Sequence, residues 1–213
     1  QVVKNRAKVE VILVNNGSSD NSSSVFDEER RTSSNSQTRL VDVPENKGYG
    51  FGIMAGVSAA RGEVIAWTHA DLQTDLKDVI DAFDVFRGQR CPAHTFLKGK
   101  RMNQKPFDTF FTFGMSLFCS FLLRQSMFDI NAQPKIFHRQ FLEHLEQVPN
   151  DFSLDLYAFY KAKSCGLDVV EFPVHFLQRR HGKAKGGGTF LGKLRLIRRT
   201  LSYVFRLKRQ LGV

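Results

Sequence analysis

Cysteine and long apolar runs are both scarce in this sequence of 213 residues. Its three cysteines, Cys91, Cys119 and Cys165, are odd in number and far apart. This argues against a disulfide framework or a zinc knuckle and favours a reducing compartment. No stretch reaches the roughly 18 apolar residues that a membrane-spanning helix needs, because the longest uncharged run, 109–123, contains Thr and Ser. The composition, 42% apolar and 24% charged, is that of an ordinary globular domain.

Acidic residues are absent from the C-terminal part of the sequence. The net charge is +10, but residues 172–213 hold eleven Lys or Arg and no Asp or Glu, so the first 171 residues sum to −1. A basic segment of this kind needs an anionic partner: the phosphates of a ligand, a lipid surface or nucleic acid. Nucleic acid is the least favoured, because the segment lacks the regular aromatic platforms of single-strand binders.

The alternation of apolar strands and helical patterns predicts a parallel α/β sheet. Strands are expected at 9–16, 38–43 and 63–67, and helices at 48–62 and 76–88. A Phe-rich helix is expected at 107–123, and a further strand in "DVVEFPVHFL" (168–177). Ligands of such sheets bind beyond the carboxyl ends of the strands. The segments "NNGSSD" and "THADLQ" both follow strands, so we expect them to line one cleft.

Three side chains able to bind a metal alternate in "THADLQ". His69, Asp71 and Gln73 supply one nitrogen and two oxygens, a set that suits Mg²⁺ or Mn²⁺ held together with waters and substrate phosphates. The alternative is that they only cap the helix that begins near Asp75.

The glycines of "GYGFG" (48–52) admit two interpretations. They resemble a dinucleotide-binding fingerprint, but that fingerprint follows its strand directly, and here "PENK" intervenes. Close packing of a glycine-rich helix is the better interpretation.

Five motifs, in order, resemble those of the family 2 glycosyltransferases with a GT-A fold, in the branch of dolichyl-phosphate mannosyltransferase and the polyprenyl-phosphate sugar synthases. "VILVNNGSSDNS" is similar to that branch's V-D-D-G-S-x-D-x-[ST]. "ENKGYGFGIMAGVSAARGEVIAWTHADLQTD" is similar to its N-x-G-x-x-x-A-x-x-x-G…D-A-D-L-Q stretch. "LKGKR", "DINAQPKIFHR" and "RRHGKAK" resemble its G-x-R, D-x-x-S-G-F and R-x-x-G-x-S-K segments. The family's first strand has no counterpart, so we expect a fragment or a pocket without one wall.

Roles follow from this resemblance residue by residue. His69 stands where the family has the first Asp of its metal motif, and Asn16 stands where it has an Asp that contacts the nucleotide. The implied metal ligands for Mg²⁺ or Mn²⁺ are His69, Asp71 and Gln73. The implied catalytic residues are Asp71, Arg179 and Lys185. The implied nucleotide-sugar ligands are Asn15, Asn16, Gly17, Ser18, Asp20, Asn46, Gly48 and Ala70. The implied contacts to an acceptor phosphate are Lys100, Arg101, Arg139, Arg179 and Lys183.

The resemblance implies inverting, metal-dependent transfer of a sugar from a nucleoside-diphosphate sugar to a polyprenyl phosphate. A phosphate acceptor is already anionic and needs no general base; Asp155 is the nearest substitute for the base of relatives that use a hydroxyl acceptor. That hydroxyl acceptor, on a polysaccharide for example, is one alternative, and a catalytically impaired nucleotide-binding module is another.

The expected organisation is a GT-A-like domain at 1–189 followed by a basic amphipathic helix at 190–213. We expect this helix to lie on an anionic membrane surface, its apolar face only partly covered by the domain, so that the protein is cytoplasmic and peripherally bound to the membrane. Its arginines expected to be exposed are Arg195, Arg198, Arg199, Arg206 and Arg209.

Overall fold

The computed structural model describes residues 8–32, 37–71, 73–102, 106–175 and 190–211. Its N-terminal part is a two-stranded parallel sheet of β1 (Val11–Asn16) and β2 (Thr38–Val43). Helices α1 (Ser22–Thr32) and α2 (Tyr49–Ala59) follow these two strands. Strand β1 is the apolar, β-branched run of the sequence, and it ends before Gly17, whose φ of 61° turns the chain at little steric cost.

The second sheet has four strands in the order β3 (Val64–Trp67), β5 (Lys135–His138), β4 (Thr95–Met102) and β6 (Asp168–His175). Strand β6 runs parallel to β4, whereas β5 pairs antiparallel with both β3 and β4. The α/β sheet with flanking helices is therefore as predicted, but two of the four described strand pairings are antiparallel. Since β5 alone is reversed, β3 and β4 end at the same edge, beside the start of β5.

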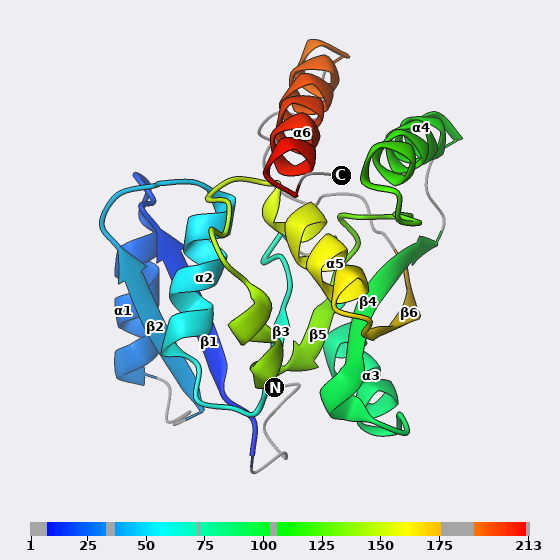
Figure 1. Cartoon of the computed structure of the whole chain (residues 1–213). Coiled ribbons are helices and arrows are strands. Elements are labelled where there is room, and N and C mark those ends of the chain that lie inside the picture. The colour runs from blue at the N-terminus through cyan, green and yellow to red at the C-terminus, as the bar shows by residue number, and fades with distance from the viewer. Residues whose placement is uncertain (1–7, 33–36, 72, 103–105, 176–189, 212–213) are drawn as a thin grey trace.

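Helices cover both faces of this second sheet (Figure 1). Alternate residues of the central strands face opposite sides: Phe96 and Phe137 belong to the core that contains α5 (Leu154–Ser164), and Leu97 and Ile136 belong to the core beneath α3 (Leu76–Arg87). Within α3, Phe86 is buried in this core, whereas Leu76 at the start of the helix is exposed. Two short 3₁₀ helices, Pro92–His94 and Arg139–His144, complete this part of the chain.

The glycines of "GYGFG" bring α2 against neighbouring backbone. A Cβ added to Gly50 would lie 2.2 Å from the Pro149 carbonyl oxygen, and one added to Gly48 would lie 2.3 Å from that of Asn150. The interpretation as close packing is therefore confirmed.

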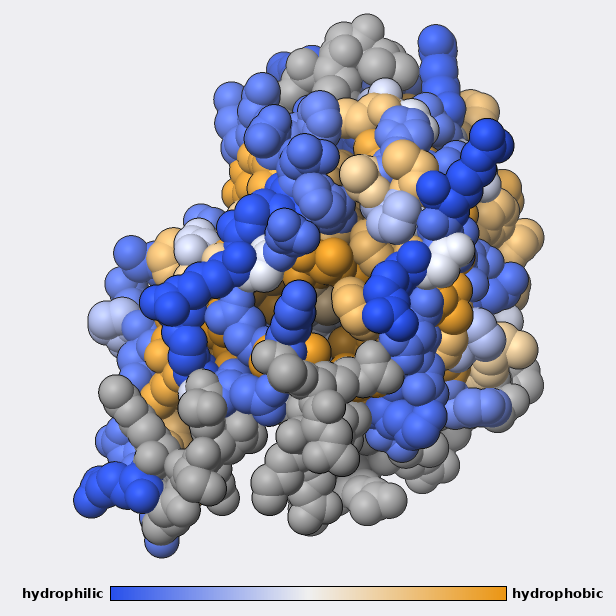
Figure 2. All heavy atoms as spheres, turned by 90° about the horizontal axis from the view of Figure 1, so that it is seen from below, coloured by the Kyte–Doolittle hydropathy of each residue, from blue (hydrophilic) through white to orange (hydrophobic). Residues whose placement is uncertain are grey.

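Helices α4 (Pro106–Leu123) and α6 (Phe190–Leu211) stand beyond the edge at which β4 ends (Figure 1). They meet through an edge-to-face contact between Phe118 and Phe205, with ring centroids 6.1 Å apart. Within the described chain, no helix combines the length and apolar character needed to cross a membrane. Seen from the opposite end, the surface is mostly hydrophilic, with apolar side chains showing in a central hollow (Figure 2).

Candidate functional site

The end of β1 presents a buried hydrogen-bond acceptor. The Asn16 side chain donates from Nδ2 to the Gly48 carbonyl, 2.9 Å away, and packs against Gly52, where a Cβ would lie 2.8 Å from that nitrogen. Its Oδ1 is buried and has no partner among the described residues. A buried acceptor without a partner costs free energy, so Asn16 is suited to accept a hydrogen bond from a ligand such as a base or ribose.

Other residues expected to contact the nucleotide organise the loops around Asn16 instead. Asn15 is buried, and its amide nitrogen donates to Ser23 and Asp42 at 2.8 and 3.0 Å. Both of its amide donors are thus used within the fold, and contact of Asn15 with a nucleotide stays a prediction. The Asp20 carboxylate accepts from the Ser22 backbone amide at 3.0 Å at the start of α1.

The remaining loop residues stay close to the same strand ends. The Ser18 amide donates to the Asn15 side-chain oxygen at 3.3 Å, and the Asn46 side-chain oxygen accepts from the Gly48 amide at 3.0 Å. Gly17 approaches Asn46 so closely that a Cβ would lie 2.4 Å from its nitrogen. The loops that follow β1 and β2 are therefore held against one another.

His69 and Asp71 follow β3 at the same edge. The His69 Nε2 atom lies 3.1 Å from the Tyr49 hydroxyl, and the Asp71 carboxylate accepts from the Gln73 backbone amide at 3.2 Å. Burial lowers the pKa of His69, while the nearby carboxylates of Asp155 and Asp71 act in the opposite direction. The ring is thus neutral near pH 7, the form that binds metals. Ala70, between His69 and Asp71, is exposed.

These side chains fit an open metal site rather than a closed one. The described residues contain no cluster of three or more His, Cys, Asp or Glu side chains able to hold an ion. If His69, Asp71 and Gln73 held an ion, one histidine nitrogen, one carboxylate and one amide oxygen would leave positions for donor phosphates and water, as Mg²⁺ and Mn²⁺ sites at nucleotides require.

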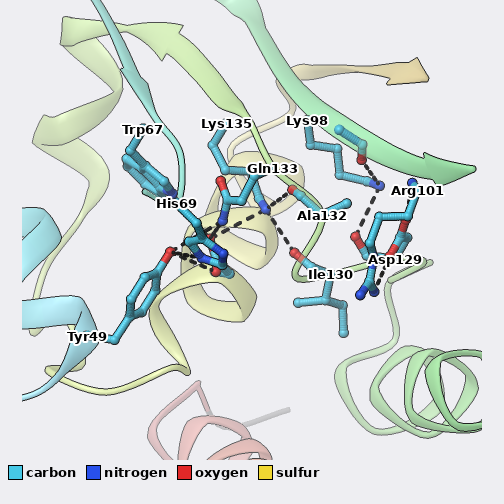
Figure 3. Close-up of polar contacts among 12 residues, drawn as sticks. Tyr49, Trp67, His69, Lys98, Arg101, Asp129, Ile130, Ala132, Gln133 and Lys135 are labelled. Atoms are coloured by element: carbon cyan, nitrogen blue, oxygen red, sulfur yellow. Dashed lines mark hydrogen bonds and ion pairs between the residues drawn. The ribbon is translucent and has the colours of Figure 1, made fainter. Parts of the chain in front are cut away.

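A buried polar network lies directly behind His69 (Figure 3). Its centre is Asp155, which is 2% exposed. One carboxylate oxygen accepts from Trp67 Nε1 at 3.2 Å and from Gln133 Nε2 at 3.0 Å, and the other accepts from the Tyr49 hydroxyl at 3.2 Å. Burial and the Asp155 charge both raise the pKa of Tyr49, which keeps this hydroxyl protonated.

Lys135 neutralises this carboxylate. Its side chain is fully buried, and its ammonium lies 3.4 Å from Asp155 Oδ1. It also donates to the backbone carbonyls of Ile130 and Ala132 at 3.0 and 2.6 Å. Burial lowers the pKa of Lys135 to about 8, with Asp155 opposing that shift. A buried ammonium with three acceptors is stable only while its partners stay in place.

The cations expected to bind an acceptor phosphate are distributed over both ends of the sheet. Arg101 forms a two-pronged pair with Asp129 at 2.8 and 2.5 Å, and Lys100 pairs with Glu171 at 2.9 Å. Both lie at the edge where β4 ends. The expectations for Arg179, Lys183 and Lys185 fall outside the described residues.

Arg139 lies at the other end of the sheet. It follows the reversed strand β5, and its guanidinium donates to the carbonyls of Gly62 and Ala60 at 2.8 and 2.5 Å, at the start of β3. Arg139 therefore lies at the opposite end of β3 from His69, and its contact with an acceptor phosphate stays a prediction.

Residues 1–145 match the family model described as glycosyl transferase family 2. The chain belongs to glycosyl transferase family 2. Among curated proteins no sequence match was found.

Solved structures with the same architecture agree with this family. Glucosyl-3-phosphoglycerate synthase from Mycobacterium tuberculosis, in complex with Mn²⁺, uridine diphosphate and glucosyl-3-phosphoglycerate, is similar at 14% identity and a TM-score of 0.68, over 93% of this chain and 68% of that one. The mannosyltransferase from Pyrobaculum calidifontis in complex with GDP-Man and Mn²⁺ is similar at 18% identity and a TM-score of 0.58, over 89% and 55%.

These likenesses support the GT-A fold of this family 2 chain. A mycobacterial protein with a TM-score of 0.65 and 16% identity, matched over 92% of this chain and 64% of its own, has the same fold. The chain thus spans between about half and two thirds of the length of these three structures.

The sequence did not point to Tyr49, Trp67, Gln133 and Lys135 as part of the site. The sequence does contain a signal for the pair of Lys135 and Asp155. The segments "PKIFH" and "SLDLYAF" each place one of these charged residues among apolar ones. Charged residues are almost never fully buried unless they are paired. Two such segments indicate a buried ion pair, although only the fold shows that they meet.

Proposed function

We propose that this chain transfers a sugar, with inversion, from a nucleoside-diphosphate sugar to a polyprenyl phosphate at an anionic membrane surface. The single observation that favours a lipid acceptor is an exposed aromatic stripe on α4 beside the exposed arginines of α6.

The stripe has the spacing of one helix face. Phe110, Phe113, Leu117 and Phe121 are separated by three, four and four residues, and they are 73%, 54%, 55% and 81% exposed. Exposed apolar patches of this kind mark protein or membrane contacts. Phe128, which stacks on Phe113 at 6.3 Å, extends the stripe.

The neighbouring helix supplies the positive charge. Arg195, Arg198, Arg206 and Arg209 of α6 are exposed, as expected, whereas Arg199 is half-buried because it packs over the Phe152 ring at 5.0 Å. Each basic residue near an anionic bilayer contributes about 1 kcal/mol to binding. Aromatic insertion together with four exposed cations fits an anionic lipid surface better than a neutral one.

The donor would occupy the edge formed by the ends of β1 and β3. Asn16 offers its unpaired acceptor to the nucleoside, and the close backbone at Gly17 and Gly48 admits the ribose and diphosphate. His69, Asp71 and Gln73 would hold Mn²⁺ or Mg²⁺. A bound divalent ion supplies Lewis-acid neutralisation of charge on the departing nucleoside diphosphate.

The protein's own part in the reaction is positioning rather than proton transfer. A phosphate acceptor is anionic near pH 7, so its oxygen can attack the anomeric carbon directly. Asp155 is surrounded by four donors and buried, which argues against its acting as the base for a hydroxyl acceptor. Lys100 and Arg101 lie at the β4 end, where exchange of their carboxylate partners for an acceptor phosphate would orient the lipid.

Two experiments test the acceptor and the membrane surface separately, and the first concerns the acceptor. The full chain is incubated with Mn²⁺ and radiolabelled UDP-glucose or GDP-mannose, and a short polyprenyl phosphate is compared with 3-phosphoglycerate and with an oligosaccharide. Product on the polyprenyl phosphate alone is expected. Product on a hydroxyl acceptor would overturn the lipid assignment, and donor binding without any product would favour a nucleotide-binding module.

Vesicle sedimentation tests the surface itself. Phe121→Glu and a variant with Arg195, Arg198, Arg206 and Arg209 replaced by Gln should each lose binding to phosphatidylglycerol vesicles. Leu76→Glu, an exposed apolar site on α3, is the matched control and should bind as wild type does. Equal binding of wild type to neutral and anionic vesicles, or no binding to either, would contradict the membrane role.

A further inference from the structure

The His69 ring contacts a tyrosine whose own surroundings fix the direction of each hydrogen bond. A phenol has one proton to donate and lone pairs to accept with. Around the Tyr49 hydroxyl lie Asp155 Oδ2 at 3.2 Å, Gln133 Nε2 at 3.3 Å and His69 Nε2 at 3.1 Å. The distribution of donors among these three atoms determines which nitrogen of His69 carries the proton.

Asp155 can only accept from Tyr49. Its other oxygen already faces Trp67 Nε1, Gln133 Nε2 and the Lys135 ammonium, and it lies in the first turn of α5, where a negative charge is favoured. The Tyr49 proton therefore points to Asp155. The Tyr49 oxygen must then accept from His69, as it accepts from Gln133.

From this geometry we infer that Tyr49, oriented by Asp155, is a positioning residue that holds His69 with its proton on Nε2 and a lone pair on Nδ1. The inference rests on the proposed function for its purpose, because Nδ1 is then the ligand nitrogen. Hydrogen bonds of this kind to the second nitrogen of a ligating histidine set its tautomer and ring orientation.

The Tyr49 ring is itself held from both sides. It stacks on Phe152 with centroids 4.9 Å apart and planes 6° from parallel, and it meets the edge of His69 at 5.3 Å and 85°. The Arg199 guanidinium of α6 also lies over the Phe152 ring, 5.0 Å from its centroid. The tyrosine therefore cannot turn its hydroxyl away from His69 without losing a ring stack.

The tautomer is measured directly on the metal-free full chain by long-range ¹H–¹⁵N NMR, at a pH well above the ordinary histidine pKa. The chain has six histidines, and loss of signal in His69→Gln identifies the ring. In wild type we expect both nitrogens at the limiting shifts of the Nε2–H form. In Tyr49→Phe, which keeps the ring stack, the shifts should move toward the average of two tautomers.

Asp155→Asn gives a sharper expectation. The donors around the Oδ1 position hold the asparagine oxygen there. The asparagine amide nitrogen then faces the Tyr49 hydroxyl and donates a hydrogen bond to it. The Tyr49 proton must then turn to His69 Nε2, and the ring should change to the Nδ1–H form. Tyr160→Phe, which removes the hydroxyl of a buried tyrosine in the same core, is the matched control and should leave the His69 shifts unchanged.

A second measurement uses Mn²⁺ with UDP. Pulsed electron paramagnetic resonance should show a nitrogen coupling in wild type and none in His69→Gln, and Tyr49→Phe should bind Mn²⁺ about tenfold more weakly. An Nδ1–H ring in wild type, or identical shifts in wild type and Tyr49→Phe, would overturn the inference. Because the tautomer is read without metal, absence of Mn²⁺ binding would contradict the metal role alone.

Discussion

Replacing Asp155 with Asn removes the carboxylate that pairs with Lys135 but keeps the shape of the side chain. Both groups are buried, at 2% and 0% exposed. Breaking a buried ion pair by removing one partner costs about 3–5 kcal/mol when the remaining charge must stay. Lys135 can avoid part of this cost, because its ammonium group can lose its proton and become neutral.

The pKa of Lys135 limits how large this cost becomes. Burial already lowers the pKa from 10.5 to about 8, which corresponds to roughly 3 kcal/mol of destabilisation by the buried charge. Without Asp155 the pKa of Lys135 falls further. At pH 7 the neutral amine becomes the more stable form once the charged form has been destabilised by about 1.4 kcal/mol more. Adding about 1 kcal/mol for the rearranged hydrogen bonds, we expect Asp155→Asn to lose about 2–3 kcal/mol at pH 7.

The loss should depend on pH in a defined direction. Between about pH 6 and about pH 8 the unfolded lysine is protonated in both proteins, but the folded variant has lost that proton. The stability of the variant therefore rises with pH while that of wild type does not. The difference should shrink by about 1.4 kcal/mol per pH unit up to pH 8 and stay constant above it.

Urea denaturation at several pH values measures this difference. The control is the same substitution in a Lys135→Met background, where the pH dependence of the difference should vanish. A loss that is independent of pH with Lys135 present would refute the argument that deprotonation of this lysine limits the cost.

Four further outcomes are expected. Between about pH 8 and 10, wild type should gain up to about 1.4 kcal/mol of stability per pH unit relative to Lys135→Met in urea denaturation, since its folded lysine loses the proton first. Gly50→Ala should lose about 1–3 kcal/mol by overpacking against the Pro149 carbonyl, unlike Gly114→Ala, where a Cβ meets nothing within 4 Å. Arg199→Ala should lose about 0.5–1 kcal/mol with its contact to Phe152, and exposed Arg198→Ala close to none, by thermal denaturation. Calorimetry with Mn²⁺ and UDP should show binding abolished in Asp71→Asn and preserved or strengthened in His69→Asp; equal losses would mean that histidine is the required ligand.

The sequence predicted the elements of the fold better than their pairing. Strands β1 and β3 are apolar runs that end at polar residues, and such local signals do not depend on the rest of the chain. The reversal of β5 depends on contacts between Ile65, Phe96 and Phe137, which are far apart in sequence. That reversal alone explains why Arg139, placed by motif order beside the acceptor, lies at the opposite end of β3.

In the site, too, the positions of single residues were easier to predict than the contacts between them. Asn16 ends β1, and His69 and Asp71 come soon after β3, so the rule that ligands bind beyond the carboxyl ends of strands predicted all three for one edge. Asn15, one position earlier, points to the other side of its strand and serves the fold, a distinction that period-two alternation supports but motif matching ignores. The Asp155 network draws on four separate segments, and no local pattern joins them.

The histidine at position 69 is consistent with this network in a way that an aspartate would not be. The Tyr49 hydroxyl has a single proton, which it donates in its hydrogen bond to Asp155. A second carboxylate at position 69 would face an oxygen with no proton left to donate and would add like charge beside Asp155, which is unfavourable without a cation. A neutral imidazole instead donates to that oxygen and still offers a lone pair on its other nitrogen. In His69→Asp we therefore expect tighter Mn²⁺ binding together with lower stability of the metal-free protein, which Mn²⁺ should restore. A variant that is as stable as wild type without metal would mean that Tyr49 does not discriminate between the two side chains.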